Sequence, residues 1–179
     1  SAVVTIVGLP TATISGTTTI CSGTAASITF NGTANASITY TINGGSNQTI
    51  LLNAAGTNSV STGALTANAT YTIVSVATGG PSNCSQNILG QSATVTIKAL
   101  PTATISGGTA ICTGTTTVIS FDGTPNATVT YTINGGANQT IVLNGAGSAT
   151  LTTAALTATT TYDLVSVKTN GTPNCSQTV

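Results

Sequence analysis

The sequence is nearly free of charge and lacks several of the side chains that carry most protein chemistry. Its 179 residues include two lysines and two aspartates, but no histidine, methionine, tryptophan, arginine or glutamate. A protein that binds nucleic acid neutralises phosphates with several basic side chains. Lys98 and Lys168 alone do not supply them, so we expect no nucleic-acid partner.

The same scarcity argues against catalysis. An enzyme needs a nucleophile with a base, a pair of carboxylates or a metal ion. The chain has no histidine, and Asp122 and Asp163 stand alone in the sequence. Calcium sites likewise need clustered carboxylates or carbonyls. We therefore predict no enzymatic activity, no cofactor and no metal site.

Long hydrophobic runs are also missing. The apolar runs are only a few residues long, whereas a helix needs roughly 20 apolar residues to cross a bilayer. No basic amphipathic helix of the kind that binds a membrane surface is present. We expect no direct membrane insertion in this segment.

The abundant residues are threonine, valine and isoleucine, whose branched Cβ atoms favour strands. Ile38–Ile42 alternates strictly between apolar and polar residues, as a half-buried strand does. Asn43-Gly44-Gly45 follows it and is typical of a hairpin turn. In the first half of the chain we expect strands at residues 11–15, 27–30, 38–42, 49–52, 59–61, 70–76 and 93–97. Such short strands at intervals near ten residues predict an all-β sandwich.

A direct repeat organises the chain. Leu9–Gly16 recurs letter for letter as Leu100–Gly107, and a shift of 91 positions aligns 88 residue pairs, of which 55 are identical. A period near 90 is about the size of one small domain. We therefore expect one repeat at residues 9–99 and a second at 100–179.

The frame of the repeat gives the first eight residues a separate interpretation. Ser1–Ile6, with the sequence SAVVTI, aligns with Ser92–Ile97, with the sequence SATVTI. Residues 1–8 are therefore interpreted as the last strand of a preceding repeat. The second repeat stops before it reaches its own copy of that strand. We interpret the chain as part of a longer tandem array.

The junction between repeats is predicted from Leu9 and Pro10 and from their copies Leu100 and Pro101. It is too short and apolar for a flexible linker, and proline restricts both its own φ and the residue before it. We expect consecutive domains to stack end to end, with neighbouring repeats as partners. Threonine-rich edge strands without protective lysine or proline also favour lateral association into a filament.

Four cysteines occur, two in each repeat and 63 residues apart: Cys21, Cys84, Cys112 and Cys175. Zinc ligands usually come as close cysteine pairs or together with histidine. One pair per domain instead indicates one disulfide per domain in an oxidising compartment. The connectivity stays open at this point, with a Cys84–Cys112 bond as the weaker alternative.

Two tyrosines follow the same local pattern. Leu-x-Ala-x-x-Thr-Tyr ends at Tyr71 in the first repeat and at Tyr162 in the second. The pattern resembles the tyrosine corner of immunoglobulin-like sandwiches, in which the hydroxyl bonds the backbone a few residues upstream. We expect both tyrosines to be structural.

Together these motifs resemble a known group of repeats. The motifs are Thr-Ile-Cys-Ser-Gly at 19–23, Ala-Ile-Cys-Thr-Gly at 110–114, the tyrosine pattern, and Asn-Cys-Ser-Gln at 83–86 and 174–177. They resemble the Ig-like, PKD-like repeats of very large surface proteins of flavobacteria and related gliding bacteria. The resemblance implies tandem immunoglobulin-like sandwiches, type IX secretion, display at the cell surface, and a role in adhesion, gliding motility or filament formation.

The resemblance also implies disulfides within each repeat, Cys21 with Cys84 and Cys112 with Cys175. A tension remains, because the first cysteine precedes the second strand and the second cysteine lies near the loop before the last strand. In a plain immunoglobulin topology such places can lie at opposite ends of the domain.

The expected function is therefore structural. We predict a repeat region of an extended extracellular adhesin or filament, which gives reach and takes part in no catalysis. The alternative is an array of carbohydrate-binding modules. Sugar sites usually present exposed aromatic rings, and the aromatic residues here are Phe30, Phe121 and four tyrosines.

Overall fold

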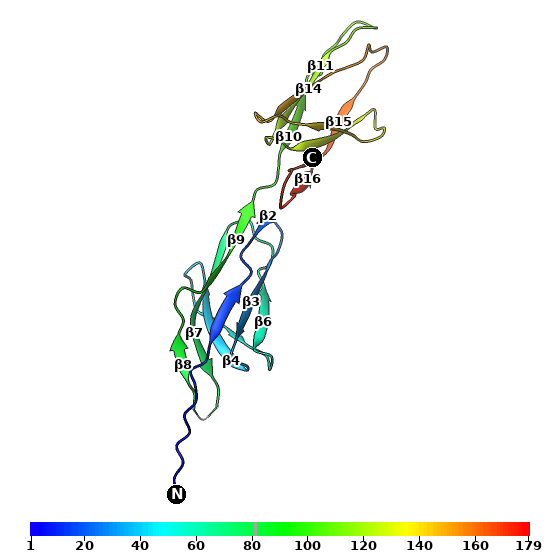
Figure 1. The fold of residues 1–179 in the computed structure, drawn as a ribbon. Coiled ribbons are helices and arrows are strands. Elements are labelled where there is room, and N and C mark those ends of the chain that lie inside the picture. Colours follow the sequence, from blue (N-terminus) through cyan, green and yellow to red (C-terminus); the bar gives the residue numbers. More distant parts are fainter. Residues whose placement is uncertain (81) are drawn as a thin grey trace. The chain divides into compact units, whose positions relative to one another are not determined.

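The computed structural model describes residues 1–80 and 82–179, and these residues form strands and no helix (Figure 1). They divide into two compact units, Ser1–Ile97 and Lys98–Val179. The division falls just before the expected boundary at Ala99. Lys98 belongs to the second unit, where its Nζ donates a hydrogen bond of 2.9 Å to the Pro173 carbonyl.

Unit 1 is a sandwich of two sheets, in which β1, β3 and β6 pair antiparallel in one sheet and β4, β5, β7, β8 and β9 pair antiparallel in the other. One sheet has the order β1-β3-β6, and the other has the order β2-β9-β7-β4-β5, with β8 paired to β7. The strands are β1 (Ala12–Ser15), β2 (Thr18–Cys21), β3 (Ser27–Gly32), β4 (Ala36–Ile42), β5 (Gln48–Leu51), β6 (Thr57–Ser61), β7 (Ala69–Thr78), β8 (Ser85–Asn87) and β9 (Ser92–Lys98).

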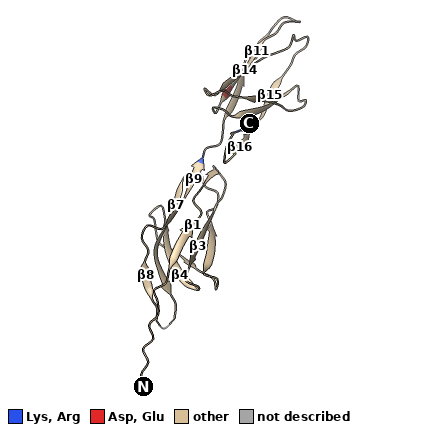
Figure 2. Ribbon diagram, viewed as in Figure 1, with Lys and Arg blue, Asp and Glu red and all other residues tan. Residues whose placement is uncertain are grey.

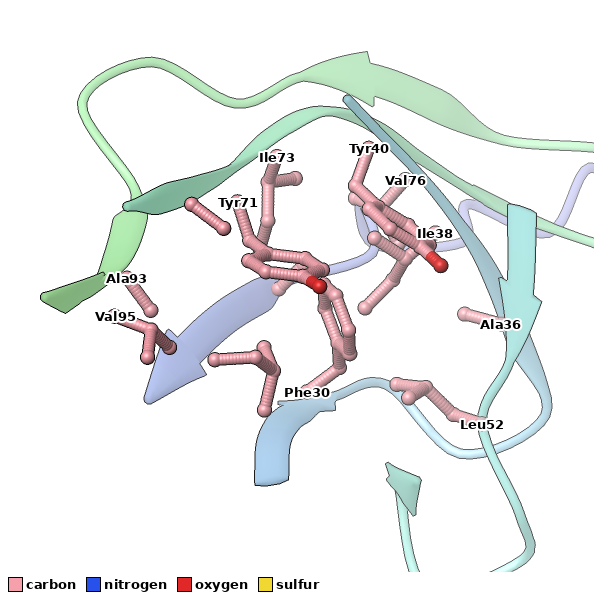
Figure 3. Close-up of a cluster of buried hydrophobic side chains, with 13 residues drawn as sticks. Phe30, Ala36, Ile38, Tyr40, Leu52, Tyr71, Ile73, Val76, Ala93 and Val95 are labelled. Atoms are coloured by element: carbon pink, nitrogen blue, oxygen red, sulfur yellow. The ribbon is translucent and has the colours of Figure 1, made fainter. Parts of the chain in front are cut away.

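The core of unit 1 lies between the two sheets and follows from the period-two pattern. Along β4, Ala36, Ile38 and Tyr40 are buried, while the intervening serine and threonines are only half-buried. Figure 3 shows that these side chains meet Phe30 and Leu52 in one cluster. Because successive side chains of a strand point to opposite faces, the alternation itself selects the buried face.

Aromatic rings occupy the middle of this core. The Phe30 and Tyr40 ring centroids lie 4.8 Å apart, and those of Tyr40 and Tyr71 lie 6.2 Å apart. Aromatic pairs at such distances add stabilisation beyond the burial of their area. The few aromatic residues of unit 1 are therefore concentrated where they bury the most surface.

The predicted hairpin turn joins β4 to β5. Asn43 and Gly44 have φ values of 51° and 69°, and the Gly45 amide donates a hydrogen bond of 2.9 Å to the Ile42 carbonyl. Two consecutive positive φ values are characteristic of a type I′ turn, whose twist matches that of the flanking strands. The prediction from Asn-Gly-Gly is confirmed.

Unit 2 repeats the sandwich with fewer strands. Its sheets have the orders β10-β11-β14 and β13-β12-β15-β16. The strands are β10 (Ala103–Ser106), β11 (Val118–Gly123), β12 (Thr128–Ile133), β13 (Gln139–Val142), β14 (Ser148–Thr152), β15 (Tyr162–Lys168) and β16 (Ser176–Thr178). Phe121 and Tyr131 lie 5.0 Å apart in its core, as their counterparts do in unit 1. Both units confirm the all-β sandwich prediction.

Candidate functional site

The charged residues do not form a site. Asp122 lies in β11 and pairs with Thr104, whereas Asp163 lies in β15 of the other sheet and pairs with Thr132. Figure 2 shows how sparse the charged positions are along the ribbon. Within residues 1–80 and 82–179, no group of three or more histidine, cysteine, aspartate or glutamate residues is placed to hold a metal ion. In that same part of the chain, no helix is long and apolar enough to span a membrane.

The cysteines correct one prediction. Cys21 and Cys175 are disulfide-bonded, whereas Cys84 and Cys112 are free thiols. The disulfides that the resemblance implied within each repeat are therefore wrong for this structure. The weaker alternative, a bond between Cys84 and Cys112, is wrong as well.

The physical reason is that the two cysteines of unit 1 lie at opposite ends of β7. Cys21 is close to the Ala69 end, because the next residues, Gly23 and Thr24, bond to the backbone of Leu65. Cys84 is at the other end, where its carbonyl accepts a hydrogen bond from the Thr78 amide. Nine residue steps along a strand span about 30 Å, whereas disulfide-bonded Cα atoms lie about 4–7 Å apart.

Unit 2 has the same arrangement. The Cys175 carbonyl accepts a hydrogen bond of 2.8 Å from the Thr169 amide, just beyond β15. Cys112 lies at the opposite end, because Gly114 donates a hydrogen bond to Leu156, which precedes β15. Each unit thus has an N-terminal pole, where the chain comes in beside Cys84 or Cys175. Its C-terminal pole carries Cys21 or Cys112.

Of the residues predicted for the joint, the prolines are buried and the leucines are exposed. Pro10 and Pro101 are buried within their own units, while Leu9 is 62% exposed. The Pro10 carbonyl accepts a hydrogen bond from the Gln86 side chain of β8, which ties the start of the repeat to the N-terminal pole of unit 1. The Leu100 side chain is partly exposed, at 36%. Each proline is therefore a buried residue just before the first strand of its unit. Its role in a stiff joint stays a prediction.

The rings of the two tyrosines that end the Leu-x-Ala-x-x-Thr-Tyr pattern, Tyr71 and Tyr162, pack against other tyrosine rings. Tyr71 is 3% exposed and packs against Tyr40, and the Tyr162 ring lies 6.5 Å from that of Tyr131. Among the hydrogen bonds of the described residues, none joins either hydroxyl to the upstream backbone, so the bond of a tyrosine corner is not seen. Burial raises the pKa of Tyr71, and the neighbouring Tyr40 raises it further. Both effects keep its hydroxyl neutral at physiological pH.

An open groove lies in unit 2 and was not predicted as a site. It has a volume of about 760 Å³ and is lined by residues 105–111 and 156–162 together with Thr113, Thr117 and Ile119. We call it the strand groove, because the same place in unit 1 holds a strand. There, β9 pairs with the first half of β7, and its Ala93 and Val95 are 1% and 0% exposed.

The two units differ at the strand groove. In unit 1, Ile20 and Leu65 pack on the core beside β9, whereas their counterparts Ile111 and Leu156 line the groove. Residues 109–112 form no strand, although the equivalent Thr18–Cys21 is β2.

Comparisons with known proteins identify the fold. No protein family matches the chain, and no curated protein matches it. Among solved structures, a marsupial T cell receptor matches with a TM-score of 0.53 and 13% identity, covering 95% of this chain and 70% of that one. A human OSCAR ligand-binding domain matches with a TM-score of 0.39 and 14% identity, covering 93% of each chain. The T cell receptor match, together with the two-sheet topology, shows that the chain has an immunoglobulin-like β-sandwich fold.

Proposed function

We propose that this chain is a structural repeat region of an extended, non-catalytic extracellular protein, in which the sandwiches provide reach. The observation that carries the proposal is the direct succession of two homologous compact units. Only four residues, 99–102, separate β9 of the first unit from β10 of the second. The connection is short and contains a buried proline, which restricts the backbone φ at that position.

The scarcity of charge supports a passive structural role. The chain has four charged side chains in 179 residues and no histidine. Electrostatic interactions between surface charges weaken as salt screens them, and histidine is the usual switch near neutral pH. A stalk built from such units would keep its properties across wide ranges of salt and pH.

The disulfide state supports a location outside the cytoplasm. Cys21 and Cys175 are disulfide-bonded, and stable disulfides form mainly in oxidising compartments. The finer assignment, to an adhesin or gliding protein displayed by type IX secretion, rests on the resemblance of the motifs at residues 19–23, 83–86, 110–114 and 174–177. It belongs to the proposal.

Cys21 and Cys175 are both disulfide-bonded, whereas Cys84 and Cys112 are free. We infer from this count that Cys21 and Cys175 bond to each other. Each such bond oxidises two thiols and passes two electrons and two protons to an acceptor, such as the disulfide of a thiol oxidase. Cys84 and Cys112 would then pair with cysteines of adjacent repeats in an array.

Lateral association into a filament is part of the same proposal. β5 and β13 are edge strands, and they expose Leu51 and Val142 at equivalent positions, 62% and 58% accessible. Neither strand contains lysine or proline, the residues that commonly protect sheet edges. Matching hydrophobic edges on successive units would let two fibres pair side by side.

The proposed extended shape of the array is tested by measuring the maximum dimension of chains with different numbers of repeats. Chains with two, four and eight copies of the repeat should show a maximum dimension in small-angle X-ray scattering that rises by about 30–40 Å per repeat, close to the diameter of one small domain. A matched variant replaces Ala99-Leu100-Pro101 by Gly-Ser-Gly and should shorten the increment. A dimension that grows like that of a compact globule would contradict the proposal.

The carbohydrate-binding alternative has no support in the structure. Phe30, Phe121, Tyr40, Tyr71 and Tyr131 are all buried, and Tyr162 is half-buried. None of the aromatic residues therefore forms an exposed platform for a sugar ring. Binding of the chain to a glycan array would reverse this assessment.

A further inference from the structure

We propose that β13, an edge strand of unit 2, pairs antiparallel with β13 of a second copy of this chain, whereas the equivalent β5 of unit 1 is protected from such pairing. The proposal rests on the lateral association proposed above and narrows it to one of the two edges. The two strands have the same place in their sheets, so the difference between them has to come from particular residues.

The hydrogen bonds of β13 show which of its backbone groups face the open edge. The Leu143 amide donates a hydrogen bond of 2.9 Å to the Ala127 carbonyl, one step beyond the pair of Thr128 and Val142 in the ladder with β12. Hydrogen-bonded and non-hydrogen-bonded pairs alternate along an antiparallel ladder. Thr140 and Val142 are therefore in non-hydrogen-bonded pairs, and their N–H and C=O groups point away from β12. Since β13 is the last strand of its sheet, these groups face no other strand of unit 2.

The equivalent edge of unit 1 carries a side-chain cap. The Leu52 amide donates to the Ala36 carbonyl, so the backbone groups of Leu51 point outward as those of Val142 do. The Leu51 carbonyl accepts a hydrogen bond of 2.7 Å from Nδ2 of Asn58, which lies in β6 of the other sheet. The amide nitrogen of Asn58 therefore occupies the place that the N–H of an added strand would take.

Unit 2 does not have this cap. The residue equivalent to Asn58, 91 positions later, is Ala149, whose methyl group has no hydrogen-bond donor. The side chains of Asn144 and Ser148, which follow β13, bond to each other, and no side chain of residues 1–80 and 82–179 donates to the Val142 carbonyl. The Val142 side chain is also 58% exposed. β13 thus combines unpaired backbone groups with an apolar side chain in water.

A second copy of β13 fits this edge. Neither β13 nor its neighbour β12 contains a charged residue, so two copies meet without the like-charge contacts that oppose the pairing of identical strands. A two-fold axis at Ile141 places Thr140 of each copy opposite Val142 of the other, and each such pair would exchange both backbone hydrogen bonds. The two half-buried Ile141 side chains would lie side by side. Because the edge has no charge to attract an acidic or basic peptide, an identical uncharged strand is the better partner.

The test measures the self-association of the chain by sedimentation velocity, after the thiols of Cys84 and Cys112 have been alkylated with N-ethylmaleimide. The parent chain should form concentration-dependent dimers. Val142→Lys should weaken association at least about tenfold, because it brings two positive charges close together across the two-fold axis. Leu51→Lys makes a matched change on β5 and should associate within about twofold of the parent chain, as a surface substitution outside the interface does.

Exchange of the cap tests the reason for the difference. Ala149→Asn supplies the missing donor to unit 2 and should weaken association. Asn58→Ala frees the Leu51 carbonyl and should strengthen association, because it makes β5 a second pairing edge. Ala149 packs on the core, so thermal unfolding of both variants is measured as well. If Ala149→Asn does not fold, Asn58→Ala decides the role of the cap.

Hydrogen–deuterium exchange reports on the edge itself. The amides of residues 139–142 should become more protected as the concentration of the chain rises, because pairing with a second copy would engage those of Thr140 and Val142. The amides of residues 48–51 should exchange at the same rate at every concentration. The equivalent strand of the same molecule thus serves as the internal control.

The outcomes that overturn the proposal are distinct from those that overturn the wider proposed function. A parent chain that stays monomeric at millimolar concentration would overturn it together with lateral association, while the increase of length with repeat number would still stand. Equal weakening by Val142→Lys and Leu51→Lys would overturn the choice of β13 and leave lateral association in place. Unchanged association of Asn58→Ala would show that the Asn58 side chain is not what protects β5.

Discussion

At the scale of single residues, the close approach of two backbone segments explains why residue 32 is a glycine. Gly32 lies in β3 opposite Ala12, and a Cβ atom placed on it would overlap the carbonyl oxygen of Thr11. Gly123 has the same relation to Thr102 in unit 2. Both glycines allow the first strand of a unit to lie tightly against its partner, β1 against β3 and β10 against β11.

We therefore predict that Gly32→Ala destabilises unit 1 by about 1–3 kcal/mol, the usual range for forcing atoms into a tightly packed site. Calorimetric unfolding of the parent chain and the variant measures the change. Gly79→Ala is the matched control, because an added Cβ there meets nothing within 4 Å and should change stability by less than about 0.5 kcal/mol. Equal effects of the two substitutions would refute the close-approach argument.

At the scale of strands, pairing with a distant segment decides whether a short element forms. Thr18–Cys21 is β2 in unit 1, where β9 lies beside it, whereas residues 109–112 form no strand. The two segments share threonine, isoleucine and cysteine at matching positions. The presence or absence of a strand at these residues therefore depends mainly on the neighbouring strand β9, since the two sequences are similar.

This difference predicts the rate of amide exchange. The amides of residues 109–112 should exchange at least about tenfold faster than those of β2, because strand pairing is what protects backbone amides. Hydrogen–deuterium exchange with mass spectrometry compares the two segments within one sample. Equal protection would mean that residues 109–112 pair with another partner.

Prediction of the elements from sequence succeeded where the pattern was local. Residues 38–42 and 70–76 were expected as strands from their alternation, and β4 and β7 contain them. β2 (Thr18–Cys21) and β8 (Ser85–Asn87) were not among the expected strands. They are strands because β9 and β7 supply hydrogen-bonding partners.

At the scale of the whole molecule, the cysteines carry the clearest consequence. In each unit the two cysteines lie at opposite poles, so neither unit can close a disulfide within itself. The disulfide of Cys21 and Cys175 therefore does not lie within one unit.

We expect peptide mapping to find this bond. The chain is alkylated with N-ethylmaleimide, digested with chymotrypsin without reductant and analysed by mass spectrometry. A linked peptide pair containing Cys21 and Cys175 should be present, and Cys84 and Cys112 should carry the alkylating group. Cys84→Ser should leave the pair intact, whereas Cys21→Ser should release Cys175 for alkylation. Recovery of Cys21 linked to Cys84 would rule the inference out.

The sequence by itself determined what depends on neighbouring residues and on internal repetition. The 91-residue period, the buried face of β4 and the Asn43-Gly44 turn follow from alternation, glycine and asparagine, which act over a few residues. The scarcity of charge likewise belongs to the sequence alone. These features were enough to predict an all-β sandwich.

The tertiary structure alone decided which distant segments meet. It placed Cys21 and Cys84 at opposite ends of β7, which excludes the disulfide that the resemblance had implied. It also left the strand groove open beside Tyr162, where unit 1 holds β9. Strand order and register depend on pairing between residues far apart in the chain, and no local pattern specifies that pairing.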